Sequence, residues 1–145
     1  MRYLVDTTVI SELTRREPDV RVMAWLREHE DLWTTSVVVG ELLFGLARLP
    51  AGRRRDALEA AVLAILAERF HDRVLPFDEH AAVEYAAVRH QQEAAGRPSG
   101  DLDAIIAAVA RSCDAVVATR NMRHFADAGV ETVDPWRDPA SRVTG

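Results

Sequence analysis

Short apolar runs alternate with longer stretches of helical periodicity along this chain. Runs rich in strand-favouring residues are typical of strands buried on both faces of a parallel sheet. They occur at residues 3–5, 32–35, 74–76, 115–119 and 130–133. Between them, apolar residues recur every three or four positions, which predicts helices. These helices are expected at 9–13, 20–30, 37–49, 53–69, 79–94 and 101–112, with a short helix or turn at 120–128.

The alternation of strands and helices predicts an α/β fold with a parallel sheet covered by helices on both faces. The pattern does not give the strand order. Ser36 is expected to cap the third helix, because it follows a strand and precedes an apolar stripe. The buried side of the 53–69 helix is predicted at Leu58, Val62, Leu63, Ile65 and Leu66, and a loose tail from Pro135.

Length and composition indicate one domain with an ordinary core, since the chain has 145 residues of which 48% are apolar. Its single cysteine, Cys113, forms no internal disulfide, which fits a reducing compartment. The longest apolar run, 60–67, is far shorter than the roughly 18 residues of a membrane span. Asp6 comes too early for a signal peptide. We therefore expect a cytoplasmic protein that makes no membrane contact.

The net charge and the choice of basic residues exclude several classes of protein. The formal net charge of −5 argues against a general nucleic-acid coat, and all 18 basic residues are arginine. The absence of lysine excludes a Walker-A phosphate loop, Schiff-base catalysis and a receiver domain that uses a lysine.

Four polar residues are predicted to meet at one edge of the sheet. Asp6 ends the first strand, Glu41 lies on the helix after the second, Asp103 is in the first turn of the 101–112 helix, and Asn121 follows the strand at 115–119. Strand carboxyl ends and the starts of the following helices share the edge where ligands bind in open α/β sheets.

Each residue also has a simpler interpretation. Asp6 is a possible helix cap, Glu41 a possible partner of an arginine, Asp103 a complement to a helix dipole, and Asn121 a turn residue. Taken together, however, like charges about 4 Å apart repel by roughly 4 kcal/mol at an effective dielectric of 20. Carboxylates gathered there need a cation or raised pKa values. Oxygen ligands without His or Cys suit Mg²⁺ or Mn²⁺.

The chain resembles the PIN-domain ribonucleases, and among them the VapC toxins of type II toxin–antitoxin pairs. The similarity is carried by five segments whose order and spacing are specific: Val5-Asp6-Thr7-Thr8-Val9-Ile10-Ser11-Glu12-Leu13, Glu41-Leu42-Leu43-Phe44-Gly45-Leu46, Asp103-Ala104-Ile105-Ile106-Ala107-Ala108-Val109-Ala110, Ala118-Thr119-Arg120-Asn121-Met122-Arg123-His124-Phe125 and Val133-Asp134-Pro135-Trp136.

The resemblance implies a three-layer α/β/α PIN domain over residues 1–134, with a tail at 135–145, and metal-dependent cleavage of RNA. It places Asp6, Glu41 and Asp103 as the acidic core that holds the metal, and Asn121 at a fourth position. Asp101 is a rival or helper for Asp103, because both lie at the helix start. The family commonly has Asn where Thr8 stands, although a threonine also offers a hydroxyl.

The implied mechanism is in-line attack on a phosphodiester by water activated on Mg²⁺. In it, Thr119 orients a ligand or water, and Arg120 and Arg123 grip flanking RNA phosphates unless they belong to a solvated turn. The family further implies a homodimer and a small VapB-type antitoxin that covers the site.

Two other functions use the same acidic edge. A Mg²⁺-dependent small-molecule phosphohydrolase usually needs a second Asp where Thr8 stands, and also a lysine. A non-catalytic acidic module would bind a basic partner without a metal.

Overall fold

A computed structural model describes residues 1–138, in which the expected alternation of strands and helices is present. In chain order the elements are β1 (Tyr3–Val5), α1 (Thr7–Leu13), α2 (Val20–Glu28), β2 (Leu32–Thr35), α3 (Ser36–Ala47), α4 (Arg53–Arg69), β3 (Val74–Leu75), α5 (Glu79–Ala94), α6 (Asp101–Ser112), β4 (Val116–Ala118), the 3-10 helix η1 (Met122–Phe125) and β5 (Thr132–Val133). Within this part of the chain, no helix has the length and apolar character needed to cross a membrane.

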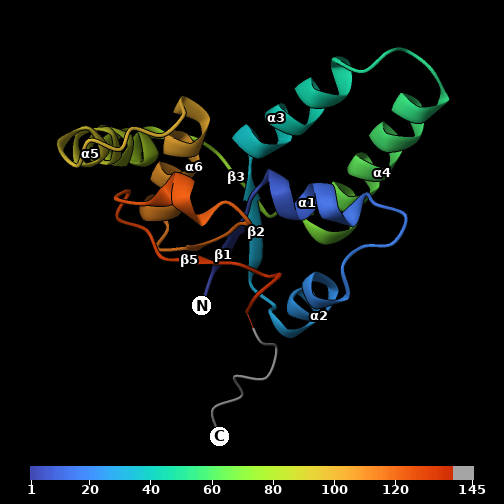
Figure 1. Cartoon of the computed structure of the whole chain (residues 1–145), viewed down its shortest axis with the longest axis horizontal. Helices are drawn as coiled ribbons and strands as arrows, with labels where there is room; N and C mark the ends of the chain where they lie inside the picture. The colour runs from blue at the N-terminus through green and yellow to red at the C-terminus, as the bar shows by residue number, and fades with distance from the viewer. Residues whose placement is uncertain (139–145) are drawn as a thin grey trace, which may run out of the picture.

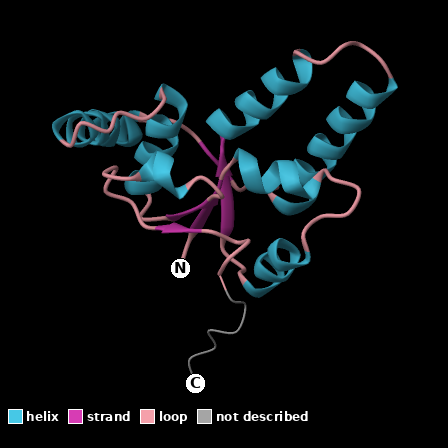
Figure 2. Cartoon of the chain, viewed as in Figure 1, coloured by secondary structure: helices cyan, strands magenta, loops and turns pink. Residues whose placement is uncertain are grey.

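The five strands form one parallel sheet in the order β3-β2-β1-β4-β5. Helices α1 to α4 lie on one side of the sheet, and α5 and α6 on the other (Figure 1). Figure 2 shows the strands enclosed between these two helical layers. The prediction of an α/β fold is therefore confirmed, with three layers. β1 lies in the middle, where the strand order reverses, so the residues after it stand at the place where open α/β sheets bind ligands.

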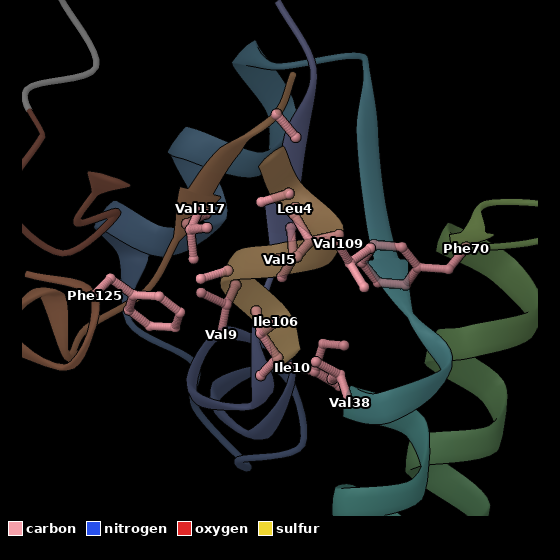
Figure 3. Packing of buried hydrophobic residues seen from close by; sticks show 14 of the residues in the cluster. Leu4, Val5, Val9, Ile10, Val38, Phe70, Ile106, Val109, Val117 and Phe125 are labelled. Carbon is pink, nitrogen blue, oxygen red and sulfur yellow. The ribbon is translucent and has the colours of Figure 1, made fainter. Parts of the chain in front are cut away.

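The core is built from the apolar runs that predicted the strands and from one stripe of each covering helix. Leu4 and Val5 of β1 are fully buried and belong to the same cluster as Ile10 of α1, Val38 of α3 and Ile106 of α6 (Figure 3). On α6 the stripe is mostly alanine, and small side chains allow a helix to approach its neighbours closely. This packing fixes the starts of α1, α3 and α6 relative to the end of β1.

The structure corrects two expectations about local structure. Thr35, and not Ser36, is the N-cap of α3, since Ser36 already has helical geometry. Leu63 is 49% exposed, and Val62 is the buried residue of α4. The reason is that α3 and α4 form a hairpin that extends away from the sheet (Figure 1), so α4 covers less of the core than its apolar content suggests.

The chain remains packed beyond the expected boundary at residue 134. Trp136 is buried, and the indole Nε1 of Trp25 donates to Asp138 at 3.2 Å. The rest of the expected tail, 139–145, lies outside the described residues.

Candidate active site

A row of four buried polar residues crosses the carboxyl edge of the sheet. The pairs Leu4 with Trp33, Val5 with Ala118, and Ala118 with Val133 set the register. Continued beyond these pairs, that register places in one row the residues Thr35, Asp6, Thr119 and Asp134, all of which are buried. Main-chain hydrogen bonds support the continuation, from Asp6 to Ala118 at 3.1 Å and from Thr119 to Val133 at 3.0 Å.

Asp6 both caps α1 and stands at the centre of this row. Its Oδ1 accepts from the backbone N–H groups of Thr8 at 3.0 Å and Val9 at 3.4 Å. The cap that the simpler interpretation proposed is thus present. A cap is ordinarily solvated, whereas Asp6 is only 4% exposed. Burial raises the pKa of Asp6, and hydrogen bonds from Thr119, Thr8 and Val9 oppose the rise.

Thr8 connects Asp6 with the loop after β4. The Thr8 hydroxyl donates to Asp6 Oδ1. Thr8 Oγ1 in turn accepts the backbone N–H of Arg120 at 3.1 Å. The hydroxyl that the sequence offered at this position therefore points into the site. It holds the carboxyl of Asp6 and the start of the segment that carries Asn121 in one fixed arrangement.

Glu41 lies close enough to Asp103 and Asp6 for their charges to affect its pKa. Its pKa is raised first by burial, then by the charges of Asp103 and Asp6. In residues 1–138, no arginine lies within ion-pair distance of Glu41, so the simpler interpretation of Glu41 as an arginine partner is not supported there. Packing of α3 against the start of α6 produces this proximity, since Leu102 lines the same groove as Glu41.

The first turn of α6 separates its two aspartates. Asp103 is half-buried, and burial raises its pKa, which the neighbouring His124 lowers. His124 Nδ1 lies 3.2 Å from Asp103 Oδ2. Asp101 instead is exposed and accepts from Arg89 at 2.8 Å. Of the pair, Asp103 faces the other carboxylates.

The loop after β4 contributes a buried hydroxyl and exposed polar residues. Thr119 is fully buried, and its Oγ1 accepts the backbone N–H of Asn121 at 3.0 Å. Asn121 is exposed at the start of η1. Arg120 and Arg123 are also exposed, and the Arg120 guanidinium lies 4.9 Å from the ring centroid of Trp136. Arg123 lines a hollow of about 270 Å³ together with Asp103 and His124.

A second hollow is an apolar groove between α1, α3 and α4. Its volume is about 560 Å³, and Glu41 lines it together with Leu42, Phe44, Leu46, Leu58, Val62 and other residues of these helices. Phe44 is 64% exposed. The groove therefore joins an uncovered apolar surface to one of the three carboxylates.

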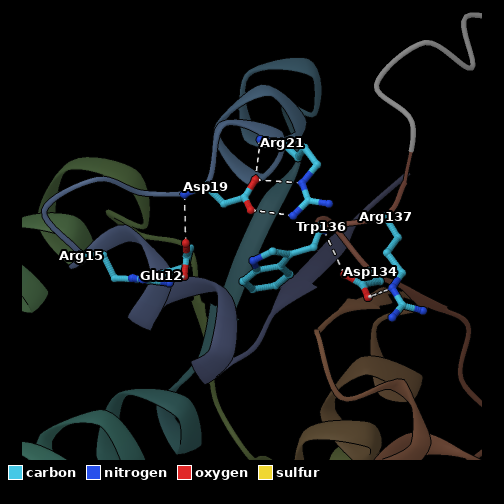
Figure 4. Close-up of polar contacts among 7 residues, drawn as sticks. All are labelled: Glu12, Arg15, Asp19, Arg21, Asp134, Trp136 and Arg137. Carbon is cyan, nitrogen blue, oxygen red and sulfur yellow. Dashed lines mark hydrogen bonds and ion pairs between the residues drawn. The ribbon is translucent and has the colours of Figure 1, made fainter.

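A polar network supports this edge from the α1–α2 connection. Buried Glu12 accepts the backbone N–H of Asp19 at 2.9 Å, and Arg21 holds the pKa of Asp19 at about 2 (Figure 4). Trp136 donates its backbone N–H to Asp134 at 2.9 Å. The turns on either side of the row are thereby fixed by hydrogen bonds.

The donor set fits a hard divalent cation. In the described part of the chain, no three His, Cys, Asp or Glu side chains are already drawn together as a metal site. Burial, and after it the charges of Asp103 and Asp6, raise the pKa of Glu41. Carboxylate oxygens are the ligands that Mg²⁺ and Mn²⁺ prefer.

Two features of the site have no local signature in the sequence. His124 contacts Asp103 across segments far apart in the chain, and its place three residues after Asn121 is the one local hint of that contact. Thr35 ends the strand expected at 32–35, and its place beside Asp6 depends on the strand order.

Comparisons with known proteins agree with this architecture. The family model described as PIN domain matches residues 3–131. The chain is 43% identical over 143 residues to VapC ribonuclease Y4jK of Sinorhizobium fredii, covering 94% of this chain and 99% of that protein. The crystal structure of FitAcB from Neisseria gonorrhoeae superposes with a TM-score of 0.84 at 36% identity, covering 93% and 99% of the two chains. VapBC-5 of Mycobacterium tuberculosis, a member of the VapBC family of toxin–antitoxin systems, gives a TM-score of 0.66 at 26% identity, covering 91% and 97%.

Proposed function

This chain belongs to the PIN-domain family and its VapC toxins, and from that premise we propose that it is a Mg²⁺-dependent endoribonuclease, with Mn²⁺ as an alternative cation. It cleaves RNA phosphodiesters by hydrolysis and acts as the toxin of a type II toxin–antitoxin pair. The observation that carries the proposal is that Asp6 follows β1, Glu41 lies on α3 and Asp103 lies in the first turn of α6, near enough for the charges of Asp103 and Asp6 to add to the effect of burial on the pKa of Glu41.

Each site residue has a distinct role in this proposal. Asp6, Glu41 and Asp103 hold the cation, and Asp101 is left out because it is engaged by Arg89. A bound divalent cation lowers the pKa of water and neutralises charge on the scissile phosphate. Thr119 stands beside Asp6 in the row and lowers the pKa of its carboxyl, so it is assigned to orient that carboxyl. Asn121 is positioned by Thr119 to orient water at the open side of the site.

RNA is held beside the acidic cluster by arginine. Arg120 and Arg123 are exposed on the loop that follows β4, and Arg123 shares a hollow with Asp103. Guanidinium groups bind phosphate oxygens in a bidentate manner. We assign these two residues to the phosphates that flank the cut.

The decisive experiment compares three Asp→Asn variants in an RNA-cleavage assay with Mg²⁺ titration. Asp6→Asn and Asp103→Asn are each expected to reduce cleavage by at least about a hundredfold, which corresponds to ~2.7 kcal/mol of lost transition-state stabilisation. Asp101→Asn is the matched control from the same helical turn and is expected to stay within about twofold of wild type (~0.4 kcal/mol). Wild-type cleavage by either of the first two variants contradicts the proposal.

The partner is proposed to be a small VapB-type antitoxin. The FitAcB and VapBC-5 structures provide the precedent, and the groove between α1, α3 and α4 provides an apolar surface with Glu41 at its side. An apolar helix or extended segment with one basic side chain suits that surface.

A homodimer of the free toxin is also proposed. Light scattering after gel filtration distinguishes a molecule of about twice 16.1 kDa from a monomer.

A further inference from the structure

Within the described part of the chain, one buried side-chain hydroxyl lacks a hydrogen-bond partner. Among the side chains of residues 1–138, Thr35 Oγ1 is the buried polar atom for which no donor or acceptor is found. Thr35 is fully buried. An unsatisfied buried hydroxyl costs about 1–3 kcal/mol, so one that is retained calls for an explanation.

The position of Thr35 makes the missing contact more unusual. Thr35 is the N-cap of α3, where a threonine hydroxyl normally accepts a backbone N–H of the first turn. Its hydroxyl makes no such bond. The adjacent Thr34 is also fully buried, but its hydroxyl donates to the carbonyl of Val5 at 2.9 Å. Of the two threonine hydroxyls at the end of this strand, Thr34 is therefore hydrogen-bonded within residues 1–138 and Thr35 is not.

The register of the sheet places Thr35 beside Asp6. Leu4 pairs with Trp33, and the Thr34 contact to Val5 continues the same register by one residue, so that Thr35 stands opposite Asp6. Partners in register on neighbouring strands project to the same face, and such strands lie about 4.8 Å apart. Thr35 thus extends, on the β2 side, the row in which Thr119 stands beside Asp6 on the β4 side.

We propose that Thr35 is a positioning residue of the acidic site, whose hydroxyl binds a water that also contacts the Asp6 carboxylate. The proposal rests on the proposed function of Asp6 as a cation ligand. Thr8 donates to the Asp6 carboxyl and Thr119 stands beside Asp6 on the β4 side, while the water held by Thr35 orients Asp6 from the β2 side. A buried water needs two to four polar partners, and the Thr35 hydroxyl and the Asp6 carboxylate supply two of them.

The test uses Thr35→Val, which removes the hydroxyl with little change in shape, and Thr35→Ser, which keeps it. Thr34→Val is the matched control, because it removes the neighbouring buried hydroxyl from a purely structural contact. The readouts are Mn²⁺ affinity of the RNA-free protein by calorimetry, kcat and KM for RNA cleavage, and the free energy of unfolding in urea.

Thr35→Val is expected to bind Mn²⁺ about tenfold more weakly, as is usual when a group that orients a metal ligand is removed. Its kcat should fall with an unchanged KM for RNA, and its free energy of unfolding should stay close to that of wild type, because the water can remain hydrogen-bonded to Asp6. Thr35→Ser should restore Mn²⁺ affinity and kcat. Thr34→Val should lose stability but keep wild-type Mn²⁺ affinity.

Wild-type Mn²⁺ affinity in Thr35→Val, or equal losses in the Val and Ser variants, overturns the role of Thr35. A wild-type protein that binds Mn²⁺ but cleaves no RNA overturns the proposed ribonuclease function instead. In that case the calorimetric comparison of the three variants still decides the role of Thr35.

Discussion

Nδ1 of His124 lies 3.2 Å from Oδ2 of Asp103. The contact joins the 3-10 helix after β4 to the first turn of α6, and so fixes the orientation of one of the three site carboxylates. Both side chains are partly solvated, so the pair contributes orientation more than stability.

Replacing His124 by Ala is expected to slow RNA cleavage by about two- to fivefold, which is the effect of losing the ~0.5–1 kcal/mol of a partly exposed pair. His124→Asn is the conservative control, because its amide nitrogen can take the place of Nδ1. Steady-state rates at saturating Mg²⁺ measure the difference. Equal losses in the two variants would show that the contact with Asp103 is not responsible.

The stability of the metal-free protein should depend on pH through Asp6. Burial raises the pKa of Asp6 in the folded state above its ordinary value of 3.8, so folding favours the protonated carboxyl. The resulting contribution to stability is complete below pH 3.8 and is lost as pH rises through the folded-state pKa. The Asp6→Asn variant keeps a side-chain oxygen that can cap α1, and it does not lose stability in this way as pH rises. Urea unfolding without metal should therefore find the variant as stable as wild type or more stable at pH 7.5, and the advantage should shrink towards pH 4.

Added Mg²⁺ should make wild type more stable than Asp6→Asn at pH 7.5, the reverse of the metal-free comparison. A cation that binds only the folded protein stabilises it by about 2.7 kcal/mol at a hundred times its dissociation constant. Wild type should gain this stability and Asp6→Asn should not. Equal gains in both proteins would remove Asp6 from the ligand set.

Thr8→Val should destabilise the protein by about 1–2 kcal/mol, since it removes a donor from buried Asp6 and an acceptor from the Arg120 N–H. It should also raise the Mg²⁺ concentration needed for half-maximal cleavage, because Asp6 loses a contact that orients it. Thr8→Ser should preserve both properties. A Thr8→Val protein with wild-type urea and Mg²⁺ midpoints would argue against a bridging role.

Phe44→Asp should separate antitoxin binding from catalysis. Phe44 is 64% exposed in the groove between α1, α3 and α4, and a charge there opposes burial of an apolar segment. Affinity for the cognate antitoxin should fall at least about tenfold, or ~1.4 kcal/mol, while cleavage by the free toxin stays unchanged. Val83→Asp on α5, at a residue that is 69% exposed outside the groove, is the control. Antitoxin affinity is measured by calorimetry. An equal loss of affinity in Phe44→Asp and Val83→Asp would show that the antitoxin does not bind in the groove.

The prediction of secondary structure from the sequence succeeded where local chemistry decides it. The strands expected at 3–5, 32–35 and 115–119 are confirmed as β1, β2 and β4, because the pattern of apolar residues depends on neighbouring positions. It failed for Leu63, whose exposure depends on how far the α3–α4 hairpin extends from the sheet.

For the site, the sequence identified Asp6, Glu41 and Asp103 as residues at one edge, since parallel strands end together. The proximity of their charges to Glu41, the ion pair of Asp101 with Arg89, the contact of His124 with Asp103 and the place of Thr35 beside Asp6 depend on the tertiary structure. The physical reason is that local pattern fixes which element a residue belongs to and which end it occupies. Contacts between elements depend on strand order, register and helix packing, which arise from the whole core at once.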